Sequence, residues 1–285
     1  MLKTPYIIVG GFLLLKTGNI IFVQTKFIMD YNNIILEIKN KISYITINRP
    51  NQLNALNSET IKELNQAIIF SEENKNIRCI LLTGSGNKAF VAGADIKEFA
   101  DFNSSQGEEL SRKGQELLFD KLEKCSTPTI AAINGFALGG GLELAMSCHI
   151  RVSSTNSKMG LPEVSLGVIP GYGGTQRLSN LVGKGKAMEM VFTAGMITAE
   201  EAFQCGLVNS ICEQEDLIPT CEKITSKICR NSRTAISSAI KAINAGFTDG
   251  TNGYEVEKKE FGNCFGTEEF IEGTTAFLEK RKAEF

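Results

Sequence analysis

Two glutamates stand among apolar and glycine residues, where a carboxylate is expected either to do chemistry or to stabilise a helix end. Glu143 follows three consecutive glycines and lies in an otherwise apolar run over 142–146. Glu163 follows a proline in a segment whose neighbouring side chains are mostly apolar. Two acids in such settings, near bare backbone amides, suit general acid–base chemistry on a carbonyl compound. The structural alternative for Glu143 is a helix-start charge that interacts with the helix dipole.

The glycines themselves have two interpretations. Glycines at a helix start leave backbone N–H groups accessible and let a ligand approach the main chain closely. One N–H from Gly139–Gly141 and one from Ala92–Asp95 are candidates for holding a developing oxyanion. Close packing of the helix against a strand is the alternative. Neither the dinucleotide motif G-x-G-x-x-G nor the P-loop motif occurs at these glycines, so they form no obvious nucleotide cradle.

Charge, histidine and cysteine content exclude several kinds of site. The 285 residues carry 30 Lys+Arg against 32 Asp+Glu, which argues against a surface that wraps nucleic acid, and we expect no such partner. His149 is the only histidine, so a multi-histidine metal site is impossible and a Ser-His-Asp triad would need that residue. The eight cysteines show no C-x-x-C spacing, and we interpret them as free thiols of a reducing compartment. We expect no metal.

The elements that must position these residues alternate between strand and helix over about 30–155. Apolar and β-branched runs predict strands at 34–39, 42–48, 78–83, 129–133 and 150–153, the first two forming a hairpin. Helical periodicity begins at 58, covers 104–124 and resumes at the glycine-led segment. Beyond 155 the pattern is almost wholly helical, with a capping box at 198–201 and helices over 217–228, 234–245, 254–265 and 268–282. The sequence therefore predicts an α/β core over 29–200 and a helical region over 201–285.

Residues 1–28 differ from the rest of the chain. They contain three lysines, no acid, and an apolar run over 6–15 that is too short to span a bilayer. The preferred interpretation is a start codon assigned too early or a disordered leader. A targeting segment and a membrane-associating segment are the alternatives, and we expect no membrane partner.

Five motifs in order make the chain resemble the crotonase superfamily, and specifically enoyl-CoA hydratases. The motifs are I-N-R-P-x-x-x-N-A-L at 47–56, A-F-V-A-G-A-D-I-K at 89–97, A-x-x-G-x-x-x-G-G-G-x-E-L-A at 131–145, the run L-P-E-V to G-G-T-Q-R-L at 161–178, and F-x-E-G-x-x-A-F-L-E-K-R at 270–281. The resemblance covers about 31–285. It implies a spiral of repeated β-β-α units with a C-terminal helical trimerisation region, as a homotrimer or a dimer of trimers.

The resemblance also implies functional residues. The backbone N–H groups of Ala94 and Gly140 would form the oxyanion hole for an acyl-CoA thioester. The implied substrate contacts are Ala92, Ala94, Asp95, Ile96, Lys97, Gly140 and Gly171. No metal or redox cofactor is implied, because coenzyme A is part of the substrate and the oxyanion hole supplies the activation.

Members of this superfamily share the oxyanion hole and differ in their acids. Hydratases resemble this chain in having both glutamates, here Glu143 and Glu163. The resemblance therefore implies hydration of trans-2-enoyl-CoA to 3-hydroxyacyl-CoA, with Glu143 taking a proton from water and Glu163 giving one to C2. Alternatives are an enoyl-CoA isomerase, a branched unsaturated acyl-CoA hydratase, or a non-catalytic RNA-binding or interaction module on the same fold.

One position departs from the family pattern. Relatives usually carry aspartate where this chain has His149, which we interpret as a structural substitution near a strand start. The expected location is the cytoplasm, or the mitochondrial matrix if residues 1–28 are a targeting segment.

Overall fold

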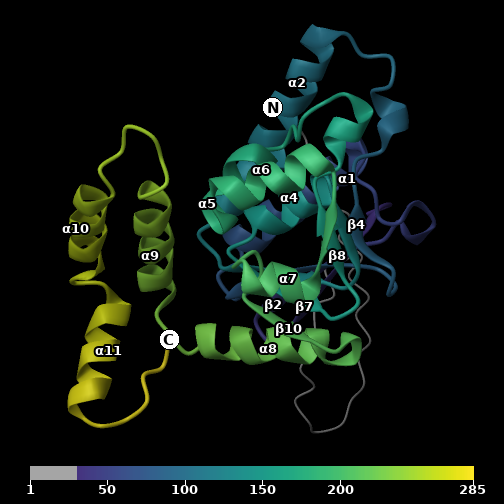
Figure 1. Ribbon diagram of the computed structural model, residues 1–285. Helices are drawn as coiled ribbons and strands as arrows, with labels where there is room; N and C mark the ends of the chain where they lie inside the picture. Colours follow the sequence, from purple (N-terminus) through teal and green to yellow (C-terminus); the bar gives the residue numbers. More distant parts are fainter. Residues whose placement is uncertain (1–30) are drawn as a thin grey trace, which may run out of the picture.

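Two β-sheets with helices around them make up the part of the chain that the computed structural model describes, residues 31–285 (Figure 1). The predictions for 1–28 lie outside the described residues. In spatial order, the larger sheet consists of β1 (Ile34–Lys39), β2 (Ile42–Ile47), β3 (Cys79–Gly84), β5 (Thr129–Ile133), β7 (Ile150–Ser154) and β10 (Ser210–Cys212).

The predicted hairpin and buried strands of the larger sheet are confirmed. β1 and β2 are antiparallel, with Ile34 opposite Ile47, and all other neighbouring strands of this sheet are parallel. The hairpin turn places Asn40 and Lys41 at φ of 52° and 66°, the left-handed conformation that matches the twist of the flanking strands.

Successive residues of the larger sheet face two different apolar cores. In β3, Ile80 and Leu82 join the core that lies toward the smaller sheet and α4, while Cys79 and Leu81 join the core beneath α8. A strand covered on both faces has no polar side, which explains its nearly continuous apolar sequence.

The smaller sheet was not predicted. Its strands are β4 (Ala89–Ala92), β6 (Phe136–Leu138), β8 (Lys158–Gly160) and β9 (Met196–Thr198), in that spatial order. Together with β10, strands β8 and β9 also show that the expectation of an almost wholly helical chain beyond 155 was wrong. Strands of three residues are too short to show a period, and they form here because neighbouring strands supply the hydrogen bonds.

The helices largely follow the predictions. They are α1 (Ser58–Glu73), α2 (Ser104–Gly114), α3 (Asp120–Glu123), α4 (Gly140–Ser147), α5 (Gly174–Val182), α6 (Lys184–Thr193), α7 (Ala199–Gln204), α8 (Leu217–Ile228), α9 (Arg233–Ala245), α10 (Gly253–Cys264) and α11 (Glu268–Leu278). The short helical turns are η1 (Pro50–Gln52), η2 (Ile96–Glu98), η4 (Glu163–Leu166) and η5 (Gln214–Asp216).

Three details of the helices bear on the predictions. The helix expected over 104–124 contains a π-helical stretch, η3 (Gln115–Phe119), between α2 and α3. The capping box is confirmed, because the Thr198 side chain accepts from the Glu201 N–H and the Glu201 carboxylate accepts from the Thr198 N–H. The last helix ends at Leu278 rather than at 282.

Helices α9 to α11 stand beside the rest of the molecule in Figure 1, whereas α8 lies against the larger sheet. Two hydrogen bonds join α9 to the core: Arg233 donates to the Glu72 carbonyl, and Asn244 donates to the Glu123 carbonyl. The expected domain boundary near 200 stays a prediction. Within residues 31–285, no helix has the length and apolar character needed to cross a bilayer.

Candidate active site

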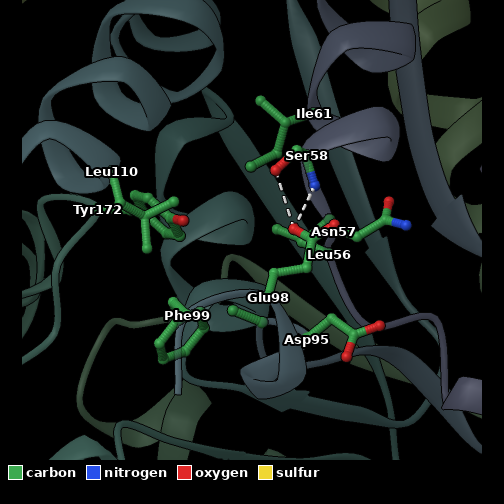
Figure 2. Close-up of a pocket in the computed structure, with 10 residues that line it drawn as sticks. Leu56, Asn57, Ser58, Ile61, Asp95, Glu98, Phe99, Leu110 and Tyr172 are labelled. Carbon is green, nitrogen blue, oxygen red and sulfur yellow. Dashed lines mark hydrogen bonds between the residues drawn. The ribbon is translucent and has the colours of Figure 1, made fainter. Parts of the chain in front are cut away.

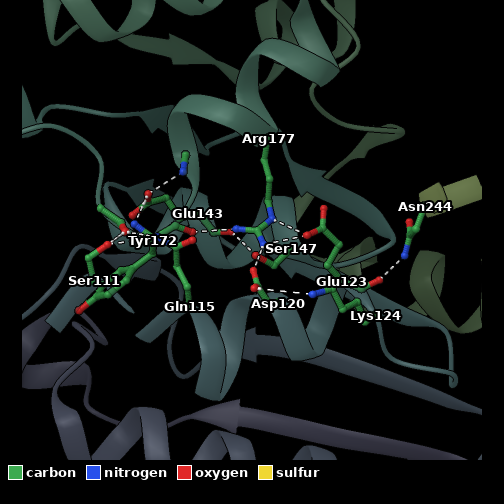
Figure 3. Close-up of polar contacts among 12 residues, drawn as sticks. Ser111, Gln115, Asp120, Glu123, Lys124, Glu143, Ser147, Tyr172, Arg177 and Asn244 are labelled. Atoms are coloured by element: carbon green, nitrogen blue, oxygen red, sulfur yellow. Dashed lines mark hydrogen bonds and ion pairs between the residues drawn. The ribbon is translucent and has the colours of Figure 1, made fainter. Parts of the chain in front are cut away.

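Glu143 lies in the first turn of α4 and is 1% exposed. Its Oε1 accepts hydrogen bonds from the backbone N–H groups of Tyr172 and Gly174, each at 2.8 Å (Figure 3). Both donors belong to the loop that leads into α5. The carboxylate is therefore held by main-chain groups, and its orientation is fixed by the loop over 171–174.

Burial gives this carboxyl an unusual affinity for protons. Loss of solvent and, to a lesser extent, the nearby charge of Glu163 raise the pKa of Glu143 from 4.5 to about 7. The two amides oppose that effect because they stabilise the ionised form. A carboxyl with a pKa near neutrality is suited to acid–base catalysis.

Glu163 approaches the start of α4 from η4. Burial raises the pKa of Glu163 as well. Its Oε2 is buried and has no hydrogen-bond partner within residues 31–285. Its Oε1 lies so close to Gly139 that a Cβ there would come within 2.6 Å of it. Since Gly139 precedes α4 and Glu143 is in the first turn of that helix, both carboxyls lie at the same helix end.

The backbone nitrogen of Ala94 lies beside Gly140 at this place. Leu56 is bonded to the residues on either side of Ala94: its N–H donates to the Gly93 carbonyl, and its carbonyl accepts from the Asp95 N–H. In such a parallel bridge the N–H of the middle residue, Ala94, faces the opposite way. A Cβ on Gly140 would lie 3.8 Å from the Ala94 nitrogen. Two amides without main-chain partners in the described chain are therefore neighbours, as an oxyanion hole requires.

The glycines of this run have different neighbours, and close packing against a strand is confirmed at one of them, Gly141. Gly139 has φ of +51° and borders the Glu163 carboxyl. Gly141 packs against β4, where a Cβ would lie 2.0 Å from the Val91 carbonyl oxygen. Close helix–strand packing at Gly141 brings α4, and with it the Gly140 amide, onto the segment that carries Ala94.

The remaining predicted substrate contacts lie around these amides. Ala92 ends β4, and Asp95 forms an ion pair of 3.1 Å with Arg49. Ile96 is 46% exposed and Lys97 is exposed, so both face solvent rather than the buried carboxyls. The Gly171 carbonyl accepts from Ser111 and Gln115, at 2.5 and 2.9 Å, which anchors the loop over 171–174 to the helix beside it.

Sequence reasoning missed Tyr172 and Arg177. Tyr172 contributes its N–H to Glu143, and its carbonyl accepts from the buried Arg177 at 2.8 Å. Arg177 also binds the carboxylates of Asp120 and Glu123, each at 2.8 Å (Figure 3). The glycines on either side of Tyr172 were the available signal, because they indicate a backbone that packs closely.

A narrow cavity of about 10 Å³ has Ala94 in its lining (Figure 2). Its lining residues are Leu56, Asn57, Ser58, Ile61, Ala94, Asp95, Glu98, Phe99, Leu110 and Tyr172. The Glu98 carboxylate accepts from the N–H and hydroxyl of Ser58, at 2.8 and 2.9 Å, and so ties η2 to the start of α1. The cavity therefore lies beside Ala94, between apolar and polar side chains.

His149 has structural contacts. Its Nδ1 accepts from the Thr129 N–H at 3.0 Å, and its Nε2 faces the Glu123 carbonyl oxygen at 3.2 Å. This pairing requires a neutral ring with the proton on Nε2, and burial accordingly lowers the pKa of His149. These contacts support the interpretation of a structural substitution. No group of three or more His, Cys, Asp or Glu within the described part of the chain is arranged to hold a metal ion.

Comparison with known proteins identifies the family of this chain. The family model described as "Enoyl-CoA hydratase/isomerase" matches residues 37–285. A short-chain-enoyl-CoA hydratase of Clostridium acetobutylicum is 48% identical over 90% of this chain and 98% of its own length. A crotonyl-CoA hydratase of Syntrophomonas wolfei is 45% identical over 90% of this chain and 99% of its own. The crystal structure of an enoyl-CoA hydratase from Bacillus anthracis superposes with a TM-score of 0.82 at 37% identity, covering 89% of this chain and 99% of that one.

Proposed function

Because the chain belongs to the enoyl-CoA hydratase/isomerase family, we propose that it adds water reversibly to trans-2-enoyl-CoA thioesters, giving 3-hydroxyacyl-CoA. The observation that carries this proposal is the buried carboxyl of Glu143 and the half-buried Glu163 at the start of α4, beside two amides without main-chain partners in residues 31–285. The names of the relatives at 45–48% identity support the same reaction.

The amides activate the substrate. The thioester carbonyl oxygen accepts from the N–H groups of Ala94 and Gly140, which stabilise the negative charge that develops on it as water adds to C3. One such donor typically lowers a barrier by about 3–4 kcal/mol. The thioester and these donors supply the activation, so the proposal includes no cofactor. Coenzyme A itself runs along Ala92 to Lys97, whose outer side is open to solvent.

The two glutamates move the protons. Glu143 takes a proton from the attacking water as its oxygen bonds to C3, and Glu163 delivers a proton to C2, which balances the addition. For dehydration the roles reverse. Burial raises both pKa values, so the pair keeps a proton near neutral pH.

Hydrogen bonding favours one distribution of that proton. Glu143 Oε1 accepts from two backbone amides, which favour its ionised form. Glu163 Oε2 is buried without a protein partner in the described residues, which leaves it free to carry a proton toward substrate. Although burial raises the pKa of Glu143 strongly, we assign the proton to Glu163 in the hydration direction, on the basis of these contacts.

The test is hydration of crotonyl-CoA by the purified protein, followed as loss of the conjugated enoyl-thioester absorbance. The Glu143→Gln/Glu163→Gln double variant is the control. Rapid loss that disappears in the variant is the expected result. An absence of turnover with crotonyl-CoA, together with activity on a 3-enoyl-CoA, would instead identify an isomerase. Salt-dependent binding of RNA without any turnover would contradict the enzymatic proposal.

We also propose a homotrimer or a dimer of trimers. The C-terminal helices and the segments joining them expose large apolar side chains, and a chain in water favours covering such surface. Those more than 60% exposed are Ile243, Phe247, Tyr254, Phe261, Phe277 and Leu278. Light scattering during gel filtration is expected to give three or six times 31.1 kDa. A mass of one chain would contradict the proposal.

A reducing compartment fits the cysteines. All eight are free thiols, and they span positions 79 to 264 of the described chain. We therefore propose a cytoplasmic location, with the mitochondrial matrix as the alternative if residues 1–28 direct import.

A further inference from the structure

The side chain of Tyr172 lines the cavity (Figure 2), as does Ala94. A Cβ on Gly140 would lie 3.5 Å from the Tyr172 ring and 3.8 Å from the Ala94 nitrogen. The ring is therefore next to the atoms that bind the thioester carbonyl under the proposed function. The sequence assigned no role to this side chain.

The Tyr172 ring is clamped in place. It stacks on Phe119 with centroids 4.6 Å apart and planes 13° apart. On another side it meets Gly114, where a Cβ would lie 2.2 Å from a ring carbon. Only glycine leaves that space. The main chain of Tyr172 is also fixed, by Glu143 at its N–H and by Arg177 at its carbonyl. A ring held in this way is a rigid wall of the cavity.

The cavity suits the apolar end of the substrate. Its lining is mixed: Leu56, Ile61, Phe99, Leu110 and Tyr172 are apolar, while Asn57, Ser58, Asp95 and Glu98 are polar. Ser58 and Glu98 are bonded to each other. The coenzyme carries phosphates that need solvent or charged partners, so the acyl group is the part of the substrate that packs against the apolar side chains. At about 10 Å³ the cavity is far smaller than the roughly 300–1,000 Å³ of pockets for drug-sized ligands. An acyl chain can therefore extend here only as far as the lining side chains leave space.

We propose that the Tyr172 ring sets the acyl-length limit of this protein by closing the cavity next to the reacting carbons, so that short 2-enoyl groups fit and long ones do not. This inference rests on the proposed function and names the residue that selects among its substrates. Replacing the ring by a methyl group opens the cavity toward Phe119 and Gly114. The Tyr172 N–H remains in the alanine variant, so the hydrogen bond to Glu143 is kept.

The test compares the full-length wild type with Tyr172→Ala, with Tyr172→Phe as the matched control that keeps the ring, and with Leu110→Ala. Leu110 lines the same cavity from α2, away from the loop that binds Glu143. For each protein, kcat/KM is measured with crotonyl-CoA and trans-2-octenoyl-CoA. Dissociation constants of butanoyl-CoA and octanoyl-CoA, which have no double bond to hydrate, are measured by titration calorimetry.

We expect the octenoyl/crotonyl ratio of kcat/KM to rise about 10- to 200-fold in Tyr172→Ala, since methylene-scale changes in an apolar pocket discriminate by such factors. The ratio in Tyr172→Phe stays at the wild-type value, and octanoyl-CoA binding tightens in step with the ratio for Tyr172→Ala. Leu110→Ala should also raise the octenoyl/crotonyl ratio and tighten octanoyl-CoA binding. This variant tests the inference if Tyr172→Ala does not fold.

Three results would overturn the inference. Unchanged octenoyl/crotonyl ratios of kcat/KM in both alanine variants, with crotonyl-CoA still turned over, would refute the role of Tyr172 in chain-length selection. They would leave the hydratase proposal intact. A shift in Tyr172→Phe equal to that in Tyr172→Ala would assign the effect to the hydroxyl group. A wild type that turns over no enoyl-CoA would refute the proposed function, and this inference with it.

Discussion

Replacing Glu143 by glutamine is expected to stabilise the protein above neutral pH while it removes activity. Glu143 is almost fully buried, and burial together with the charge of Glu163 raises its pKa to about 7. The folded protein therefore holds a charge at high pH that the unfolded chain would carry more easily. Glutamine keeps an oxygen that accepts from the two backbone amides, and it carries no charge.

The sign and size of the effect follow from the two pKa values. A carboxyl with a higher pKa in the folded state than in the unfolded state binds its proton more tightly when folded. Stability is therefore complete below the unfolded pKa of 4.5 and falls as pH rises through the folded value of about 7. At about 1.4 kcal/mol per pKa unit, the loss amounts to about 3 kcal/mol at pH 8.5. At pH 5 most of this loss of stability is absent.

The assay is thermal unfolding of wild type and Glu143→Gln at pH 5 and pH 8.5. At roughly 2–4 °C per kcal/mol, the variant should unfold several degrees above wild type at pH 8.5 and close to it at pH 5. Glu163→Gln is the matched control, since it removes the charge that raises the pKa of Glu143. An equal difference in unfolding temperature between the two proteins at both pH values, or a variant that unfolds below wild type at pH 8.5, would refute the reasoning.

Three further changes test the supports of the site. Arg177→Met removes the side chain that donates to the Tyr172 carbonyl and to two carboxylates, so we expect kcat to fall about tenfold or more and its pH profile to shift. Arg177→Lys should restore part of the lost kcat. An unchanged pH profile would contradict a positioning role for Arg177. Gly139→Ala strains a backbone at φ of +51° and brings a methyl group against Glu163, so activity should fall. The helix content measured by circular dichroism should stay at the wild-type value. His149→Phe should lower the free energy of unfolding by about 1–3 kcal/mol, measured in urea, with kcat of the folded fraction unchanged.

The sequence predicts the larger sheet well and the smaller sheet hardly at all. Strands such as β3 are long enough, and buried enough, to show an apolar run. Strands β6, β8 and β9 have three residues each, and their pairing partners rather than their own composition make them strands. The π-helical stretch over 115–119 is similar, because a single altered turn leaves the helical pattern of the sequence intact.

The site shows the same division. Glu143, Glu163 and the glycine-led helix were visible because acids among apolar residues and consecutive glycines are unusual. The loop that binds Glu143 was not, since it works through main-chain N–H groups that any residue possesses. Arg177 lies within a recognised motif, yet its partners Asp120 and Glu123 are more than fifty positions away, and only the folded chain brings them together.

The carbonyl of Glu123 joins two distant parts of the molecule. It is bonded to Asn244 of α9 and faces the ring of His149, while the carboxylate of the same residue holds Arg177. The outlying helices and the loop behind the two carboxyls thus share one residue, Glu123, as an anchor. We expect local unfolding of α9 to loosen that anchor and, with it, the support of the loop that binds Glu143.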